Sequence, residues 1–337
     1  MIELTISFSQ EVKEELSGQL NPARHCRIAE LAAMLSVDGH IYRVDSRKML
    51  GFTTENMAVA RKYFTLIRKT FNINMDISIR TYSNKKANQV YTLILSEPES
   101  IDRILKAVKI TIDDIPDARK CKAIGLNKPS NLVVQNVCCK RAFIRGAFLT
   151  AGSISDPRKA YHLELVLNSI DKAKQLQEVI GTFSIDAKIV TRKKNYVVYI
   201  KEGAQIVDLL NVMEAHVALM ELENVRILKD VRNNVNRQVN CEAANISKTV
   251  AASTKQIEDI IYIRDTIGFT DLAEGLGDIA RLRVEHPEAS LKELGTMLIP
   301  SIGKSGVNHR LRKLSMIADH IREHKEEKSN DNQTNFN

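Results

Sequence analysis

The stretch RIAELAAMLSVDGHI, from Arg27 to Ile41, decides the fold, because a later stretch repeats its pattern. It predicts a helix that ends near Asp38-Gly39 and leads into a short strand. The stretch RAFIRGAFLTAGSIS, from Arg141 to Ser155, shows the same change from helical to strand-like character. Self-similarity over a long period indicates repeated structural units, so we expect an internal duplication.

The elements that follow the two stretches also correspond. The first leads to an amphipathic helix, ENMAVARKYFTLIRKTF, then to the strands MDISIRTY and VYTLILS and a closing helix, SIDRILKAV. The second leads to the strand YHLELVLNS, the helix DKAKQLQEVIGTF, the strands AKIVTRK and YVVYIKE, and the closing helix AQIVDLLNV. Anchor residues match in pairs: Leu31 with Ile144, Phe71 with Phe183, and Tyr91 with Tyr196. We therefore predict an α+β fold with a duplicated αββαββα domain over residues 23–214, its repeats at about 23–110 and 139–214.

The first helix of each repeat resembles a known motif. LAAMLSVDG, residues 31–39, resembles the LAGLIDADG motif of homing endonucleases, and IRGAFLTAG, residues 144–152, keeps two of its glycines, Gly146 and Gly152. The resemblance implies that the two motif helices pack side by side, where small side chains allow close approach. The residues suited to that contact are Ala32, Ala33, Gly146 and Ala147.

The nuclease chemistry of that motif depends on its last acid. Two-metal cleavage of a phosphodiester needs carboxylates from both helices, and magnesium requires oxygen ligands. Asp38 stands where one acid would be, but Ala151 stands at the other position and Leu149 replaces an earlier acid. We therefore predict no catalytic residues, and we interpret Asp38 as a vestigial motif acid at a helix-terminal turn.

The five cysteines favour neither a disulfide framework nor a zinc knuckle, because their count is odd and no CxxC spacing occurs. We interpret the adjacent pair Cys138–Cys139 as small buried thiols at the start of a helix rather than as a metal or redox site. The sequence therefore predicts no metal and no cofactor.

Composition is compatible with a polyanionic partner. The net charge is +8 and the pI is about 9.1. No apolar run is long enough to span a bilayer, and the N-terminal segment, an arm over residues 1–22, has no signal-peptide pattern. We expect no membrane partner and a cytoplasmic, nucleoid-associated protein.

Residues 215–268 have helical spacing and predict a helical linker after the duplicated domain. Within it, the segment RNNVNRQVN is rich in amides and contains Arg232 and Arg237. These two arginines are candidate secondary DNA contacts, and a solvated polar helix face is the alternative.

Residues 269–325 predict an all-α helix-turn-helix domain. Asp271 is expected to cap a helix that stops at Pro287, and Ser290 to cap the next helix in a capping box with Glu293. The short connection IPSIG then leads to KSGVNHRLRKLSMIADHIREH, which completes the motif. The expected core residues are Leu291, Leu294, Leu298, Val307, Leu311 and Leu314.

The last predicted helix would begin near Lys304, and its N-terminal part contains no acid. Its side chains are of the types that contact base edges and phosphates, and a face formed by Ser305, Asn308, His309 and Arg312 would enter the major groove. The alternative is a charged surface on a structural helical bundle. The predicted DNA-binding residues are Lys304, Ser305, Asn308, His309, Arg310, Arg312 and Lys313. We expect double-stranded DNA as the partner and a disordered tail over residues 326–337.

Several longer blocks together resemble the WhiA family of bacterial DNA-binding regulators. They are SFSQEVKEEL, TENMAVAR, RGAFLTAGSISDP, KKNYVVYIKEG, VRNNVNRQVNCEAAN and KSGVNHRLRKL, and the resemblance covers nearly the whole chain. It implies a degenerate homing-endonuclease domain joined to a helix-turn-helix. It also implies roles in transcription, cell division and chromosome segregation, with sporulation in some lineages.

Three functions compete at this point. The leading one is a sequence-specific DNA-binding regulator without catalysis, and an active homing endonuclease is opposed by Ala151. The third is a chromosome-located scaffold whose duplicated domain binds a protein partner. Matching hairpins of the repeats carry cations that are either secondary DNA contacts or ordinary charged loop tips: Arg80, Lys85 and Lys86 in the first, and Arg192, Lys193 and Lys194 in the second.

Overall fold

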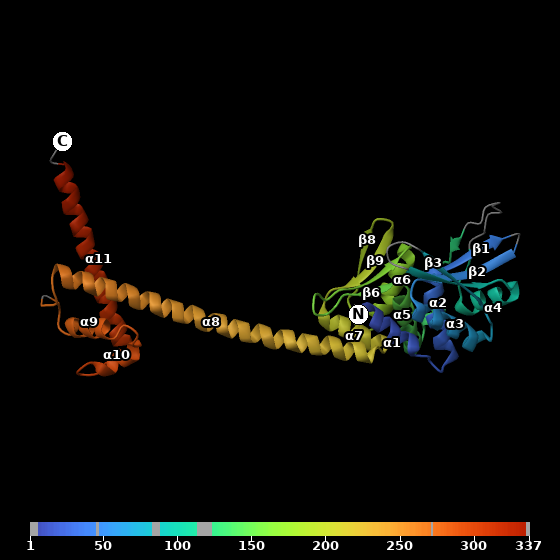
Figure 1. The fold of residues 1–337 in the computed structure, drawn as a ribbon, viewed down its shortest axis with the longest axis horizontal. Helices are drawn as coiled ribbons and strands as arrows, with labels where there is room; N and C mark the ends of the chain where they lie inside the picture. Colours follow the sequence, from blue (N-terminus) through green and yellow to red (C-terminus); the bar gives the residue numbers. More distant parts are fainter. Residues whose placement is uncertain (1–5, 45–46, 83–87, 113–122, 271, 335–337) are drawn as a thin grey trace. The chain divides into compact units, whose positions relative to one another are not determined.

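The computed structural model describes residues 6–44, 47–82, 88–112, 123–270 and 272–334. It divides into two compact units, Met1–Asp230 and Val231–Asn337, each treated by itself below. Figure 1 shows the course of the chain. Among the described residues, no helix has a stretch that is long and apolar enough to cross a membrane.

Unit 1 contains the predicted duplication. The first repeat consists of α2 (Arg24–Asp38), β1 (Gly39–Val44), β2 (Arg47–Thr54), α3 (Met57–Phe71), β3 (Asp76–Tyr82), β4 (Asn88–Leu95) and α4 (Pro98–Val108). The second consists of α5 (Val137–Ala151), β6 (Gly152–Ile154), β7 (Leu163–Leu167), α6 (Ile170–Gly181), β8 (Lys188–Arg192), β9 (Asn195–Ile200) and α7 (Gly203–Met213). The order of elements is the same in both, so the αββαββα prediction is confirmed.

Each repeat forms its own antiparallel sheet. The strand orders are β3-β4-β2-β1-β5 and β6-β7-β9-β8, and β5 (Ile124–Gly125) pairs with β1. β5 and the short 3-10 helix η1 (Asn131–Val134) belong to the connection between the repeats. Alternating burial along β7 shows that one face of its sheet is covered, as expected for a half-buried antiparallel sheet.

The two motif helices, α2 and α5, pack against each other at the centre of unit 1. A Cβ atom at Gly146 would collide with the backbone carbonyl oxygen of Glu30 and come within 3.1 Å of the Ala33 Cβ. Only glycine permits this approach. Ala32, Ala33 and Ala147 are buried as well, so the sequence identified the small residues of this region correctly.

The motif glycines Gly39 and Gly152 follow α2 and α5 directly. A Cβ on either would collide with the carbonyl oxygen four residues earlier, that of Leu35 or Phe148. Each helix can therefore change directly into a strand only if glycine occupies this position.

The predicted N-terminal arm, residues 1–22, contains a helix, α1 (Phe8–Gly18). This helix packs into the core of unit 1. The Ser7 side chain caps it by accepting a hydrogen bond from the Gln10 backbone N–H. Phe8, Val12 and Leu16 are buried at helical spacing. The arm is thus a structural part of the duplicated domain.

A single long helix, α8 (His216–Thr266), follows α7, so the prediction of a helical linker is confirmed, and the two units divide within it. In unit 2 it is followed by α9 (Leu276–Glu285), α10 (Leu291–Met297) and α11 (Lys304–Thr334). The core of unit 2 combines the end of α8 with these three helices, through residues that include Ile260, Ile263, Ile279, Leu294, Leu311 and Leu314.

Two predicted boundaries in unit 2 are wrong. α9 begins at Leu276 after Gly275, which has a φ of 76°, and not next to Asp271, which lies outside the described residues. The left-handed conformation at Gly275 interrupts the helix that its apolar pattern suggested. α11 has helical backbone as far as Thr334, so most of the predicted disordered tail is helical. Glu326, Glu327 and Lys328 in this segment favour helix, and residues 326–334 contain neither glycine nor proline.

Candidate nucleic-acid interface

The two helices of the predicted motif are α10 and α11, and local hydrogen bonds fix where α10 begins. The Glu293 backbone N–H donates to Ser290 Oγ at 3.3 Å, and the Ser290 backbone N–H donates to Glu293 Oε2 at 2.7 Å. This is the predicted capping box. The hydrogen bonds from Ser290 lower the pKa of Glu293.

The turn between α10 and α11 depends on Gly295. A Cβ there would collide with the Ile302 carbonyl oxygen, and the Ile302 backbone N–H donates to the Gly295 carbonyl at 3.0 Å. The connection therefore folds back tightly on α10. Val307, Leu311 and Leu314 of α11 are buried against it, together with Leu294 and Leu298. Leu291, predicted as core, is only half-buried.

α11 begins at Lys304, as expected, and its first turn contains no acid. Six of the seven predicted DNA-binding side chains have no hydrogen-bond or salt-bridge partner within the described part of the chain: Lys304, Ser305, Asn308, His309, Arg312 and Lys313. Asn308 is half-buried and the other five are exposed. Their spacing places Ser305, Asn308, His309 and Arg312 on one face of the helix.

Arg310 differs from these six. Its guanidinium is half-buried and donates to the Gly275 carbonyl at 3.3 Å. A Cβ at Gly275 would lie 2.9 Å from the same guanidinium. The structure therefore uses Arg310 to hold the start of α9 against α11.

The distal half of α11 is anchored on α8. Arg322 forms a salt bridge of 2.8 Å with Asp259, which is buried, and its guanidinium lies 4.9 Å from the centroid of the Tyr262 ring. Arg283 of α9 donates to Gln256 Oε1 at 3.1 Å and to the Ala289 carbonyl at 2.6 Å. These contacts support the helix whose N-terminal turns are exposed.

The candidate contacts in the hairpins of unit 1 are not equivalent. The Arg192 guanidinium lies 3.7 Å from the Glu164 carboxylate, whereas Lys193 and Lys194 are exposed at the turn between β8 and β9. Arg80 is exposed on β3, and Lys85 and Lys86 lie outside the described residues.

On α8, Arg232 and Arg237 are both exposed. Two neighbouring cations already have internal partners, because Arg226 pairs with Glu223 at 2.7 Å and Lys229 donates to the Pro157 carbonyl at 2.7 Å. Of these four cations on α8, Arg232 and Arg237 are therefore the ones available to DNA.

The positions of the predicted motif acids lie at the C-terminal ends of α2 and α5. Asp38 is the last residue of α2, and Ala151 is the last residue of α5. Asp38 is half-buried near Lys13 and Lys172; burial raises its pKa and the neighbouring cations oppose that rise. Lys172 Nζ donates to the Ser36 carbonyl at 2.6 Å and to Asn168 Oδ1 at 3.0 Å, and burial lowers its pKa to about 8. His40, Lys13 and Lys172 thus supply the positive charge near Asp38.

Three family models match the chain in succession. They are the WhiA N-terminal LAGLIDADG-like domain over residues 24–111, the WhiA LAGLIDADG-like domain over residues 140–232, and the WhiA C-terminal HTH domain over residues 235–318. The chain is 58% identical over 320 residues to a protein of Lachnoclostridium phytofermentans named probable cell division protein WhiA, with 94% of this chain and 100% of that protein covered. The chain belongs to the WhiA family. Its resemblance to that family, stated from sequence blocks above, is confirmed.

Other members of the WhiA family agree along the whole chain. A protein of the same name from Alkaliphilus metalliredigens is 48% identical, with 94% of this chain and 99% of that protein covered. The crystal structure of full-length DUF199/WhiA from Thermatoga maritima matches with a TM-score of 0.56 at 25% identity, covering 94% of this chain and 99% of that chain. The succession of two LAGLIDADG-like domains and an HTH domain is therefore that of WhiA.

Sequence reasoning missed a buried ionic network in this WhiA chain. Glu30 of α2 is fully buried and lies 3.0 Å from Lys62 Nζ and 3.1 Å from Arg145 Nε. Arg145 also contacts Glu214 at 2.8 Å. At Lys62, burial lowers the pKa by more than the negative charge of Glu30 raises it. At Arg145, the negative charges of Glu30 and Glu214 raise the pKa by more than burial lowers it. The only sequence signal was a charged residue at an inward-facing position of each motif helix.

Proposed function

We propose that this protein is a sequence-specific regulator that binds double-stranded DNA through the N-terminal turns of α11 and has no catalytic activity. The observation that carries the proposal is the group of six polar and cationic side chains on α11 that have no partner among the described residues. Unpartnered donors on an exposed first turn suit a ligand with many acceptors, and the recognition helix of a helix-turn-helix presents its N-terminal residues to base edges.

Each side chain suits a particular contact. Arg312 can donate two hydrogen bonds to guanine, and Asn308 can pair with adenine in the major groove. Lys304 and Ser305, in the first turn, suit phosphates, which the positive end of the helix also favours. We propose that Arg310 stabilises the start of α9 and is not a main base contact, because its guanidinium already donates to the Gly275 carbonyl.

The cellular process we propose is cell division, the role in the name of the relatives from Lachnoclostridium phytofermentans and Alkaliphilus metalliredigens. DNA binding would serve this role through transcription or chromosome segregation on the nucleoid.

Absence of catalysis is supported by the two helix ends. Ala151 offers no oxygen ligand, and Lys13 and Lys172 supply positive charge beside Asp38, where a nuclease would hold its metal ions. We expect the purified protein to leave plasmid DNA intact with magnesium or manganese. Metal-dependent nicking that disappears in Asp38→Asn would contradict this assignment.

Chromatin immunoprecipitation with sequencing tests the DNA-binding proposal most directly. Discrete peaks that share a sequence, and that vanish in Arg312→Ala, are the expected result. Arg281→Ala is a matched control, because Arg281 is an exposed arginine of the same unit on α9. Diffuse signal, or peaks that persist in Arg312→Ala, would refute sequence reading by α11.

A further inference from the structure

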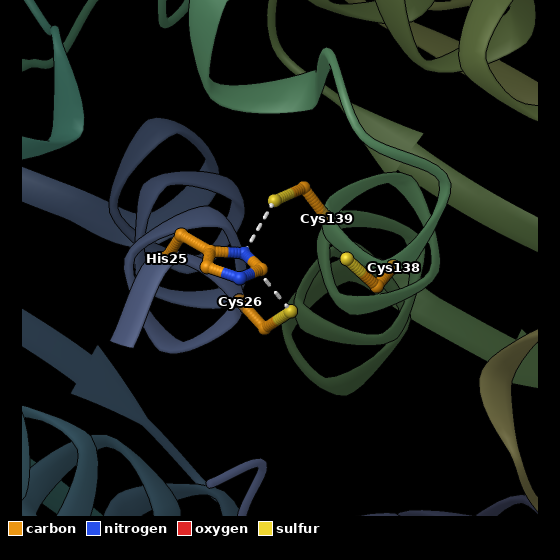
Figure 2. Close-up of side chains that lie close together, drawn as sticks. All are labelled: His25, Cys26, Cys138 and Cys139. Carbon is orange, nitrogen blue, oxygen red and sulfur yellow. Dashed lines mark hydrogen bonds between the residues drawn. The ribbon is translucent and has the colours of Figure 1, made fainter. Parts of the chain in front are cut away.

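Four side chains with metal-ligating atoms meet where α2 and α5 begin. His25 and Cys26 lie in the first turn of α2, and Cys138 and Cys139 lie in the first turn of α5. Their ligand atoms all lie within 4.8 Å of one another. Figure 2 shows the His25 ring of α2 between Cys139 of α5 and Cys26 of α2. Cys138 lies beside them on α5.

The cluster follows the internal duplication. His25 and Cys26 precede Cys138 and Cys139 by 113 residues each, which is also the separation of the motif glycines Gly39 and Gly152. The two repeats therefore contribute equivalent adjacent pairs, one from each motif helix. The interpretation of Cys138 and Cys139 as small buried thiols is wrong for Cys138, which is exposed, and it considered only one of the two pairs.

We propose that His25, Cys26, Cys138 and Cys139 bind one Zn²⁺ ion that joins α2 to α5 at their N-terminal ends. Three thiolates and one imidazole are a common structural zinc set, with four tetrahedral ligands. Zn–S distances of about 2.3 Å and Zn–N distances of about 2.0 Å place ligand atoms about 3.5–3.8 Å apart in a tetrahedron. His25 Nδ1 already lies 3.2 Å from Cys139 Sγ and 3.4 Å from Cys26 Sγ, so small side-chain rotations complete the site.

The surroundings favour a bound thiolate. The residues that precede the helices, Ala23 and Asn136, make no side-chain capping hydrogen bonds, so the positive helix ends face the cluster without a competing cap. His25 and Cys138 are exposed, which leaves a path by which the ion enters.

The ligand set selects the metal. Thiolates are poor ligands for magnesium or calcium, whereas tetrahedral sulfur and nitrogen ligands are typical of zinc or iron–sulfur centres, and three cysteines with one histidine are a structural zinc set. Cys26 and Cys139 form a small buried cluster with Ala29 and Ala142, and Ala23 packs against it. A zinc ion would join the two helices at this end, where the apolar side chains of the cluster are small.

Elemental analysis of the full-length protein, purified without immobilised metal and with a thiol reductant, tests the proposal. We expect about one zinc per chain, as for a single structural site. Cys138→Ser and His25→Ala should each lose most of the zinc, and because both positions are exposed, these variants should keep their circular dichroism spectra. Cys241→Ser, which changes an exposed cysteine of unit 2, should keep the full content. Zinc-free protein, or equal zinc in all four proteins, overturns the proposal.

A second measurement separates zinc from a redox pair. After exchange of the ion for Co²⁺, the protein should show the visible d–d bands of a tetrahedral site and thiolate-to-metal charge transfer, and Cys138→Ser should weaken both. Chelation should lower the melting temperature of the parent protein but not that of Cys138→Ser. An intact mass two hydrogens lower in reductant-free protein, restored by reductant and accompanied by no metal, would show a disulfide and refute the zinc site.

Discussion

The buried cations of unit 1 and the exposed cations on the first turns of α11 have opposite roles. In unit 1, Lys62 and Arg145 are buried against Glu30, and Lys172 donates to a backbone carbonyl. In unit 2, Lys304, Arg312 and Lys313 of α11 are exposed and have no partner within the described residues. A cation with a buried partner contributes to the fold, whereas an exposed one without a partner is available to a ligand. The position of a cationic residue on a helix therefore indicates ligand binding only when its internal partners are also known.

The largest expected effect is on the folding of unit 1. Glu30→Gln leaves the buried cations Lys62 and Arg145 without their shared anion. Removal of one partner from a buried ionic network costs about 3–5 kcal/mol. We expect a loss of that size in the free energy of unfolding, measured by urea denaturation followed by circular dichroism.

Lys48 and Asp102 provide the matched control for Glu30, because the Asp102 carboxylate of their 2.8 Å salt bridge is exposed and Lys48 is only half-buried. Asp102→Asn should cost less than about 1 kcal/mol. Similar losses in Glu30→Gln and Asp102→Asn would mean that the buried network contributes no more than a surface pair.

The next effect separates two arginines of α11. Arg312→Ala should weaken binding to the preferred DNA site by about 1–3 kcal/mol, the value of a good bidentate base contact, and leave stability unchanged. Arg310→Ala should instead lower the stability of unit 2 by about 0.5–1.5 kcal/mol, since it removes the hydrogen bond to Gly275. Fluorescence anisotropy and urea denaturation of both variants measure the two quantities. If Arg310→Ala weakens binding more than Arg312→Ala at equal stability, the roles are reversed.

Much of this fold could be predicted because it repeats. The matched anchors, from Leu31 and Ile144 onward, identified both copies, and Ser290 with Glu293 identified the start of α10. These features depend on local spacing, which sequence shows directly. The start of α9 was missed because Gly275 adopts a left-handed conformation that its apolar neighbours do not reveal.

The sites were less accessible because their residues are distant in sequence. Glu30, Lys62 and Arg145 come from three helices, and the pairs at Cys26 and Cys139 have no spacing motif. Only the packing of α2 on α5 brings them together. Arg310 illustrates the opposite error, since its place on the recognition helix suggested DNA and its contact is internal.

A smaller effect concerns pH. Burial lowers the pKa of Lys172 from 10.5 to about 8, so between these values the unfolded chain binds more protons and stability rises with pH. Lys172→Met should remove about 1–2 kcal/mol of this rise. Lys174→Met, which changes an exposed lysine of the same helix, should preserve it. Urea denaturation across this pH window measures the difference, and identical pH profiles for the parent and Lys172→Met would show that Lys172 is not perturbed by the fold.

The smallest expected effect is on the salt dependence of DNA binding, which shows whether unit 1 also contacts DNA. Lys193 and Lys194 are the exposed cations at the β8–β9 turn, and each phosphate that they neutralise contributes about −0.9 to the slope of log affinity against log salt. We propose that both contact the DNA backbone, so Lys193→Asn with Lys194→Gln should make the slope shallower by about 0.9–1.8. Asparagine suits Lys193 because its φ is 58°. Lys106→Gln with Lys174→Gln removes the same charge from exposed helix positions and should leave the slope unchanged. Equal slopes for all three proteins would mean that this hairpin lies away from DNA, and would favour a protein partner for the duplicated domain.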